Sequence, residues 1–126
     1  CETICPGSSD CYRAHTVQAS NKVAEKLGLS DSQWEIAYQS RLGPGWLTPF
    51  TDKRLAEMPN KDLKSVLVVC PSFISDCLET LEEIEIRGRE TFFNSGGQNM
   101  TYIPCLNDSG DTINLLESLV LESEIK

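Results

Sequence analysis

The chain has 126 residues, of which 40% are hydrophobic and 24% are charged. These are ordinary values for one globular domain, and they exclude a disordered chain. Nineteen acidic residues against eleven basic ones give a formal net charge of −8. Because a phosphate-binding surface needs clustered Lys and Arg, we expect no nucleic acid partner. No apolar stretch approaches the roughly 20 residues of a membrane span, which leaves only peripheral contact with a membrane open.

The six cysteines fall into two groups. Three of them crowd residues 1–12, a segment without helical or strand periodicity, and three occur singly in residues 13–126. A secreted disulfide scaffold usually spreads its cysteines through a loop-rich chain. Residues 13–126 instead alternate helix and strand patterns. We therefore expect a cysteine-rich segment followed by one α/β domain, in a reduced, cytoplasmic environment.

The first half of the domain is predicted to alternate helix, strand and helix. Apolar residues at helical spacing indicate a helix over residues 13–27, which Gly28 would end. A short strand follows over residues 34–40. A Gly- and Pro-rich loop at residues 43–46 then precedes a helix over residues 51–58.

The second half of the domain contains the clearest strand. Residues 65–70 form a continuous β-branched apolar run, which is typical of a strand buried on both faces of a parallel sheet. The longest helix is predicted over residues 76–93, a third strand over residues 101–104, and a last helix over residues 111–121. This order predicts a three-layer αβα domain with a parallel sheet.

Ligands of such sheets bind outside the carboxyl ends of the strands. Three predicted loops would lie at that edge, over residues 41–50, 70–77 and 104–110. These loops contain most of the unusual residues of the chain, so we expect the functional site there.

Three carboxylates stand at the start of the longest predicted helix. Asp76, Glu79 and Glu83 are spaced i, i+3 and i+7, which places them on one helical face. Their mutual repulsion in a cleft would be relieved by a bound cation or proton. Asp76 and Glu79 also fit an ordinary capping box at a helix N-terminus. That alternative does not account for Glu83.

Trp46 and Arg41 belong to the Gly- and Pro-rich loop. A Trp on a rigid loop can stack on a flat aromatic ligand, although a Trp that closes the end of a sheet is commoner. Arg41 follows the predicted strand directly and can pair with an anionic group such as a propionate. An ordinary surface Arg is the alternative.

The spacing of Cys1, Cys5 and Cys11 is compatible with thiolate ligands of zinc or of an iron–sulfur cluster. Such a site needs a fourth ligand, and Cys105 is the best candidate because it lies in a loop at the end of a strand. Disulfides or unrelated thiols are the alternatives. His15 is the single histidine, so a histidine-based metal site is excluded.

Three segments resemble the ferrochelatase family in the family's own order. YQSRLGPGWLTPFTD at residues 38–52 is similar to the segment that carries a porphyrin-contacting Trp. VVCPSFISDCLETLEEI at residues 68–84 resembles the family's acidic helix, and YIPCLND at residues 102–108 resembles its final strand and loop. The similarity extends over about residues 11–121.

The resemblance implies one lobe, the C-terminal one, of a two-lobed chelatase. Two similar α/β lobes enclose a cleft in which protoporphyrin or coproporphyrin is bent and iron(II) replaces two pyrrole protons. By resemblance, Glu79 delivers the metal or removes protons, and Asp76 and Glu83 line the same path. Trp46 would contact the macrocycle, with Arg41 as a candidate neighbour.

Four departures from the family pattern accompany the resemblance. Cys77 stands where many members of the family have His, and a Cys at this position resembles a bacterial subgroup. The loop before Trp46 is one residue shorter than the usual family pattern. The family's catalytic His, in a Ser-x-His-Gly-type motif, would lie upstream of Cys1. The resemblance also implies an N-terminal lobe that these residues do not include, and we expect the chain alone to be inactive.

The resemblance changes the interpretation of the cysteines. Some bacterial ferrochelatases hold a [2Fe–2S] cluster through an internal cysteine segment, which Cys1, Cys5, Cys11 and Cys105 resemble. Two other hypotheses stay open: a single-lobe chelatase that rebuilds the cleft as a homodimer, and a non-catalytic module that binds a tetrapyrrole or an iron–sulfur cluster. A porphyrin metallation assay on the chain distinguishes them.

Overall fold

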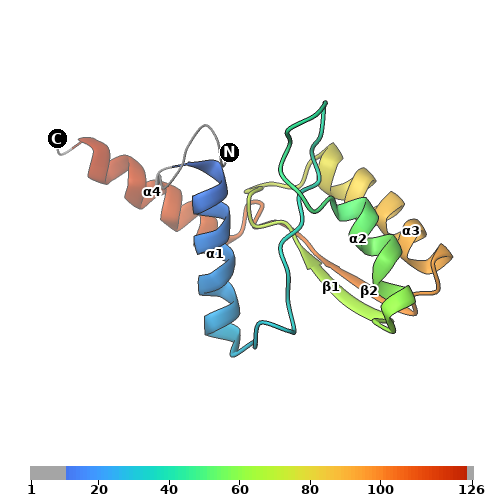
Figure 1. Cartoon of the computed structure of the whole chain (residues 1–126). Coiled ribbons are helices and arrows are strands. Elements are labelled where there is room, and N and C mark those ends of the chain that lie inside the picture. The colour runs from blue at the N-terminus through green and yellow to red at the C-terminus, as the bar shows by residue number, and fades with distance from the viewer. Residues whose placement is uncertain (1–10, 125–126) are drawn as a thin grey trace.

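The computed structural model describes residues 11–124. Helices and strands alternate along the chain, and Figure 1 shows their arrangement. In chain order the elements are α1 (Tyr12–Leu27), α2 (Thr51–Glu57), the 3₁₀-helix η1 (Met58–Lys61), β1 (Ser65–Val69), the π-helix η2 (Glu79–Gly88), α3 (Arg89–Asn94), β2 (Asn99–Ile103) and α4 (Gly110–Glu124).

The described sheet has two strands, β1 and β2, which are parallel. Their register runs from Ser65 opposite Asn99 to Val69 opposite Ile103. Parallel strands need a crossover connection, and here it is the continuous helical segment formed by η2 and α3. The predicted α/β class with a parallel sheet is therefore confirmed.

The hydrophobic core lies on one face of this sheet, where α2, η2 and α3 cover it (Figure 1). Phe92 of α3 is fully buried, and Gly97 lies directly against its ring. A Cβ at residue 97 would meet the ring at 2.2 Å, so only glycine fits there. The buried hydrophobic residues of this core are Leu55, Ile84, Phe92, Met100 and Tyr102.

The opposite face of the sheet is exposed. Side chains alternate between the two faces along a strand, and those that point away from the core are Leu67, Val69 and Ile103. Leu67 is 61% exposed. The second helical layer of the predicted three-layer arrangement therefore does not cover this face within residues 11–124.

The predicted strand over residues 34–40 is wrong. This segment makes a single isolated bridge, between Tyr38 and Phe50, and is not part of the sheet. A strand is stable only with a hydrogen-bonded neighbour along its length. The described residues give this segment no such neighbour, whatever its local preference.

The prediction of one long helix from Asp76 is also wrong at its start. The helix begins at Glu79, after Leu78, and its first ten residues are a π-helix. Asp76 lies outside it because its carboxylate and its backbone N–H are engaged with residues that follow β2. The three carboxylates therefore do not share one helical face: Glu79 and Glu83 are on η2 and Asp76 precedes it.

Candidate functional site

The loops after β1 and β2 meet at the carboxyl edge of the sheet, as predicted. The backbone N–H of Asn107 donates to the carbonyl oxygen of Ile74 at 2.8 Å. The Sγ of Cys105 lies 4.0 Å from the carbonyl oxygen of Cys70. Because the two strands are parallel and paired in register, their carboxyl ends lie side by side, and both loops start at the same edge of the sheet.

Asp76 is the centre of this loop contact. Its carboxylate accepts hydrogen bonds from Tyr102 Oη at 2.6 Å, Asn107 Nδ2 at 2.7 Å, Thr80 Oγ1 at 3.1 Å and the N–H of Cys105 at 3.3 Å. The bonds from Tyr102 and Asn107 hold the pKa of this carboxyl well below its usual range. Asp76 is thus ionised, with three protein donors at Oδ1 and one at Oδ2.

Glu79 is the first residue of η2, and its side chain is exposed. Hydrogen bonds from the Cys77 thiol and from its own backbone N–H lower the pKa of its carboxyl. Neither donor carries a positive charge. Glu79 therefore presents an ionised carboxylate to solvent beside a thiol.

Glu83 is four residues further along η2 and half-buried. The side-chain amide of Gln39 donates to one of its oxygens. Arg87 Nη2 lies 3.5 Å from its other oxygen, and the same nitrogen pairs with Glu82 at 2.7 Å. The acidic segment is therefore only partly balanced by positive charge.

The loop that carries Trp46 is closed at its base by two hydrogen bonds. The N–H of Tyr38 donates to the carbonyl of Pro49 at 2.8 Å, and the N–H of Thr51 donates to the carbonyl of Tyr38 at 3.0 Å. Figure 1 shows this loop extending beyond the end of the sheet between residue 38 and α2. Trp46 is 42% exposed. The bond from Gln39 to Glu83 joins the base of the loop to η2.

Arg41 already has a partner within the loop. Its guanidinium pairs with the Asp52 carboxylate at 2.7 Å and lies over the Phe50 ring, 4.7 Å from the ring centre. Both charged side chains are exposed. An anionic ligand of Arg41 would therefore have to compete with Asp52.

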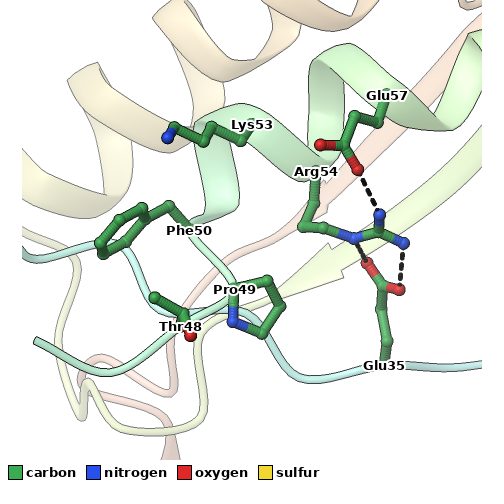
Figure 2. Close-up of a pocket in the computed structure, with 7 residues that line it drawn as sticks. All are labelled: Glu35, Thr48, Pro49, Phe50, Lys53, Arg54 and Glu57. Atoms are coloured by element: carbon green, nitrogen blue, oxygen red, sulfur yellow. Dashed lines mark hydrogen bonds and ion pairs between the residues drawn. The ribbon is translucent and has the colours of Figure 1, made fainter.

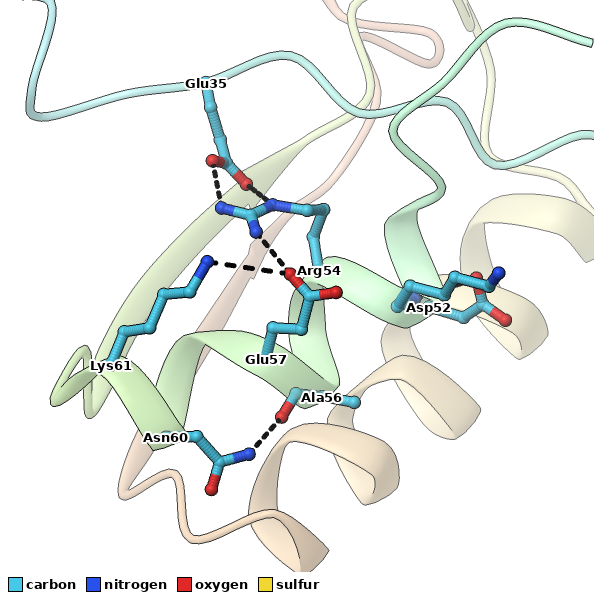
Figure 3. A network of polar contacts seen from close by, with 8 residues as sticks. Glu35, Asp52, Arg54, Ala56, Glu57, Asn60 and Lys61 are labelled. Carbon is cyan, nitrogen blue, oxygen red and sulfur yellow. Dashed lines mark hydrogen bonds and ion pairs between the residues drawn. The ribbon is translucent and has the colours of Figure 1, made fainter.

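A depression of about 450 Å³ lies beside the start of α2. Its lining, shown in Figure 2, includes Phe50, Lys53 and Arg54, and it includes none of the predicted site residues. Arg54 is bound on both sides, by Glu35 at 2.6 Å and Glu57 at 2.5 Å. Figure 3 shows this ion-pair network, which ties the segment before the Trp46 loop to α2. The sequence patterns did not indicate the pair of Arg54 with Glu35, because these two residues are 19 positions apart.

The predicted cluster ligands are only partly described, because Cys1 and Cys5 lie outside residues 11–124. Cys11 is the N-cap of α1, and its sulfur accepts the Ala14 N–H at 3.5 Å. Burial raises the pKa of the Cys105 thiol, and the Asp76 carboxylate raises it further. In the part of the chain that is described, no three His, Cys, Asp or Glu side chains form a group able to hold a metal ion.

Sequence reasoning missed three side chains that organise this edge: Tyr102, Asn107 and Gln39. Tyr102 alternates with Met100 on the core face of β2, and a buried hydroxyl needs a partner, which was a usable signal. Asn107 occurs in an ordinary turn sequence, and nothing in Gln39 indicates its bond to Glu83.

The family of the chain follows from comparison with known proteins. A family model described as Ferrochelatase matches residues 2–124. The chain belongs to the ferrochelatase family. The acidic residues of η2, the Trp46 loop and the loop after β2 are thus family segments that the fold brings to one edge of the sheet.

Several curated ferrochelatases are similar to the chain. The protein from Ectopseudomonas mendocina is 44% identical over 121 residues, which cover 94% of this chain and 36% of the relative. Ferrochelatase from Opitutus terrae is 44% identical, with 95% of this chain and 35% of the relative covered. Ferrochelatase 1 from Shewanella oneidensis is 48% identical over 114 residues, which cover 90% of this chain and 34% of the relative. The chain spans about a third of the length of these ferrochelatases.

The described helices also bear on membrane association. Among residues 11–124, no helix combines the length and the apolar character that crossing a membrane requires.

Proposed function

We propose that the chain is the C-terminal lobe of a ferrochelatase that inserts iron(II) into protoporphyrin or coproporphyrin in haem biosynthesis. The observation that carries the proposal is the arrangement of Glu79 and Glu83 on one helix at the carboxyl edge of the sheet, joined through Gln39 to the Trp46 loop. Family membership over residues 2–124 supports it.

The chemistry requires a cation to be delivered and two protons to be removed. Iron(II) enters the ring, two pyrrole N–H bonds break, and two protons leave, so the charge balances. Glu79 is suited to these steps because it is ionised and exposed and has no cationic partner among residues 11–124. Glu83 is suited to pass on the metal ion or the protons, because its carboxylate is held in place by Gln39 and Arg87.

The Trp46 loop supplies the second part of the proposed site. A half-exposed indole on a loop with a fixed base offers a flat apolar surface for a macrocycle. Arg41 is a neighbour of this surface and could meet a propionate if its pair with Asp52 opened. In this proposal the reaction is that of a lyase in the cytoplasm, and the chain alone does not turn over.

The isolated chain gives the first test. Incubated with protoporphyrin and iron(II) under anaerobic conditions, it should produce no haem, because the proposed cleft needs a second lobe. Turnover would favour the homodimeric single-lobe chelatase. Tight porphyrin binding without turnover, even when the rest of a ferrochelatase is supplied, would favour the non-catalytic module.

A chimaera tests the role of Glu79. Residues 2–124 would replace the matching third of the Ectopseudomonas mendocina ferrochelatase. Glu79→Gln should lower the metal insertion rate at least about 100-fold, with porphyrin binding retained, because a carboxylate that moves protons is lost. The control is Glu82→Gln on the same helix, which removes one charge that is already paired with Arg87. A Glu79→Gln variant as fast as the Glu82→Gln control would remove Glu79 from the mechanism.

The proposal also includes a [2Fe–2S] cluster that Cys1, Cys5 and Cys11 would hold together with a fourth ligand. Support comes from the spacing of these three cysteines and their resemblance to a bacterial cysteine segment. The proposed fourth ligand is Cys105, which lies in the loop that follows β2. Anaerobically purified protein should contain iron and acid-labile sulfide, and colourless protein loaded with zinc would refute the cluster.

A further inference from the structure

Asp76 joins the loop after β2 to the start of η2 by a reciprocal pair of hydrogen bonds. Its carboxylate accepts from Asn107 Nδ2 at 2.7 Å, while its backbone N–H donates to Asn107 Oδ1 at 2.8 Å. The two residues are 31 positions apart in the sequence. A two-point contact fixes orientation as well as distance, so Asp76 cannot rotate away without losing both bonds.

The other partners of Asp76 extend this contact on both sides. Tyr102, a buried residue of β2, donates to Oδ1 at 2.6 Å. Thr80, whose side chain is fully buried in the first turn of η2, donates to the same oxygen at 3.1 Å. The Oγ1 of Thr80 also accepts the N–H of Cys77 at 3.0 Å. Asp76 therefore links the sheet to the backbone on either side of Glu79.

The occupancy of the carboxylate argues against a direct role in chemistry. A carboxylate has about four lone-pair sites. Four donors already approach that of Asp76: Tyr102 Oη, Asn107 Nδ2, Thr80 Oγ1 and the N–H of Cys105. Three of these donors share Oδ1 and only Asn107 approaches Oδ2, so iron or a pyrrole proton could use only the remaining lone pair of Oδ2. Among the described residues, the donors at the Glu79 carboxylate are the Cys77 thiol and its own N–H.

We propose that Asp76 is a positioning residue, which together with Asn107 and Tyr102 fixes the first turn of η2 and thereby the Glu79 carboxylate. This role differs from the predicted one, in which Asp76 lines the metal path as a catalytic group. This inference rests on the proposed function only for the role of Glu79 in metal delivery and proton removal. The structural link itself is independent of it.

A side-chain swap tests the proposal. Asp76→Asn alone places two amide groups against each other, and Asn107→Asp alone places two carboxylates against each other. The double variant restores a carboxylate–amide pair in which every donor again meets an acceptor, with the negative charge moved to position 107. A double-mutant cycle of this kind isolates the interaction of the two residues.

The first readout is hydrogen exchange of the amides in residues 77–83, measured on the 126-residue chain without metal. Each single variant should lose protection in this segment, and the double variant should regain it. Tyr102→Phe, which removes one donor, should produce a smaller loss in the same amides. Unchanged protection in the single variants, or no recovery in the double variant, would overturn the positioning role.

The second readout is Co(II) binding to the same chain, followed by visible absorption. Each single variant should bind Co(II) about 10–100-fold more weakly, as expected when a residue that orients a metal ligand is altered. The double variant should return towards the original affinity with the original spectrum. If Asp76 were itself a ligand, the double variant would stay weak and its spectrum would change. Asp108→Asn removes a negative charge from the same loop, and it therefore controls for the effect of net charge on Co(II) affinity.

The two readouts separate this inference from the proposed function. If the original chain bound no Co(II), or bound it equally well after Glu79→Gln, the proposed role of Glu79 would fail. The exchange cycle would still decide whether Asp76 and Asn107 fix the start of η2.

Discussion

The two sides of the chain differ in how they bury apolar side chains. On the core side, α2, η2 and α3 close over one face of the sheet around Phe92. On the other side, the outer face of the sheet is bare, and α1 and α4 expose much of their apolar surface. The exposed apolar residues of α4 are Ile113, Leu115, Leu116, Leu119, Val120 and Leu121.

This difference indicates which side of the chain is stabilised by contacts among the described residues. The core side has the packing of an independent domain. The other side exposes many apolar side chains on α1, α4 and the outer face of the sheet, and clustered exposed apolar surface is typical of surfaces that another part of a protein covers. The curated ferrochelatases are about three times as long as the matched region.

The sharpest test of this comparison is Phe92→Ala, which should destabilise the chain by about 3–5 kcal/mol because it empties the centre of the core. The matched control is Phe93→Ala, the next residue of α3, which is 41% exposed against 0% for Phe92. Urea denaturation followed by circular dichroism measures both. Equal losses for the two variants would contradict a core confined to one face.

Alkylation of Cys70 gives a second test. Burial raises the pKa of this thiol from 9.0 to about 11. The raised pKa favours the folded state below pH 9, and this contribution is lost as the pH rises from about 9 to 11. At pH 9, iodoacetamide should therefore modify Cys70 about fiftyfold more slowly in the folded chain than in urea, since the thiolate is the nucleophile. Peptide mass spectrometry measures the rates, and equal rates would show that this end of β1 is open.

The smallest effect is expected on the exposed side. Leu119→Ala in α4 should change the free energy of unfolding by no more than about 0.5 kcal/mol, because the side chain is 53% exposed and has little contact to lose. The same urea denaturation applies. A loss comparable to that of Phe92→Ala would mean that α4 belongs to the core, and the contrast between the two sides would disappear.

The predictable parts of the fold were those with strong local signals. The run of residues 65–69 is β-branched, and α1 ends at Gly28 in a left-handed conformation as expected. The meeting of the loops after β1 and β2 was also predictable, because parallel strands in register must end at the same edge. Residues 34–40 were not, since a strand requires a neighbour that local sequence cannot supply.

The site was harder to predict because its organisation is non-local. The prediction that Asp76, Glu79 and Glu83 share one face required an α-helix through all three residues. Asp76 instead bonds to Asn107, and the helix starts later and with π geometry. Helical periodicity contains no information about a partner 31 residues away.

The open edge of β1 has a consequence for handling the protein. Among the described residues, β1 has a hydrogen-bonded neighbour on one side only, and its sequence, SVLVV, is uncharged and apolar after Ser65. Such an edge is a template on which a second copy can add a strand. Mutual repulsion from the net charge of −8 then keeps copies apart. Colloidal stability should therefore fall as the pH approaches the isoelectric point near 4.6, or as salt screens that charge.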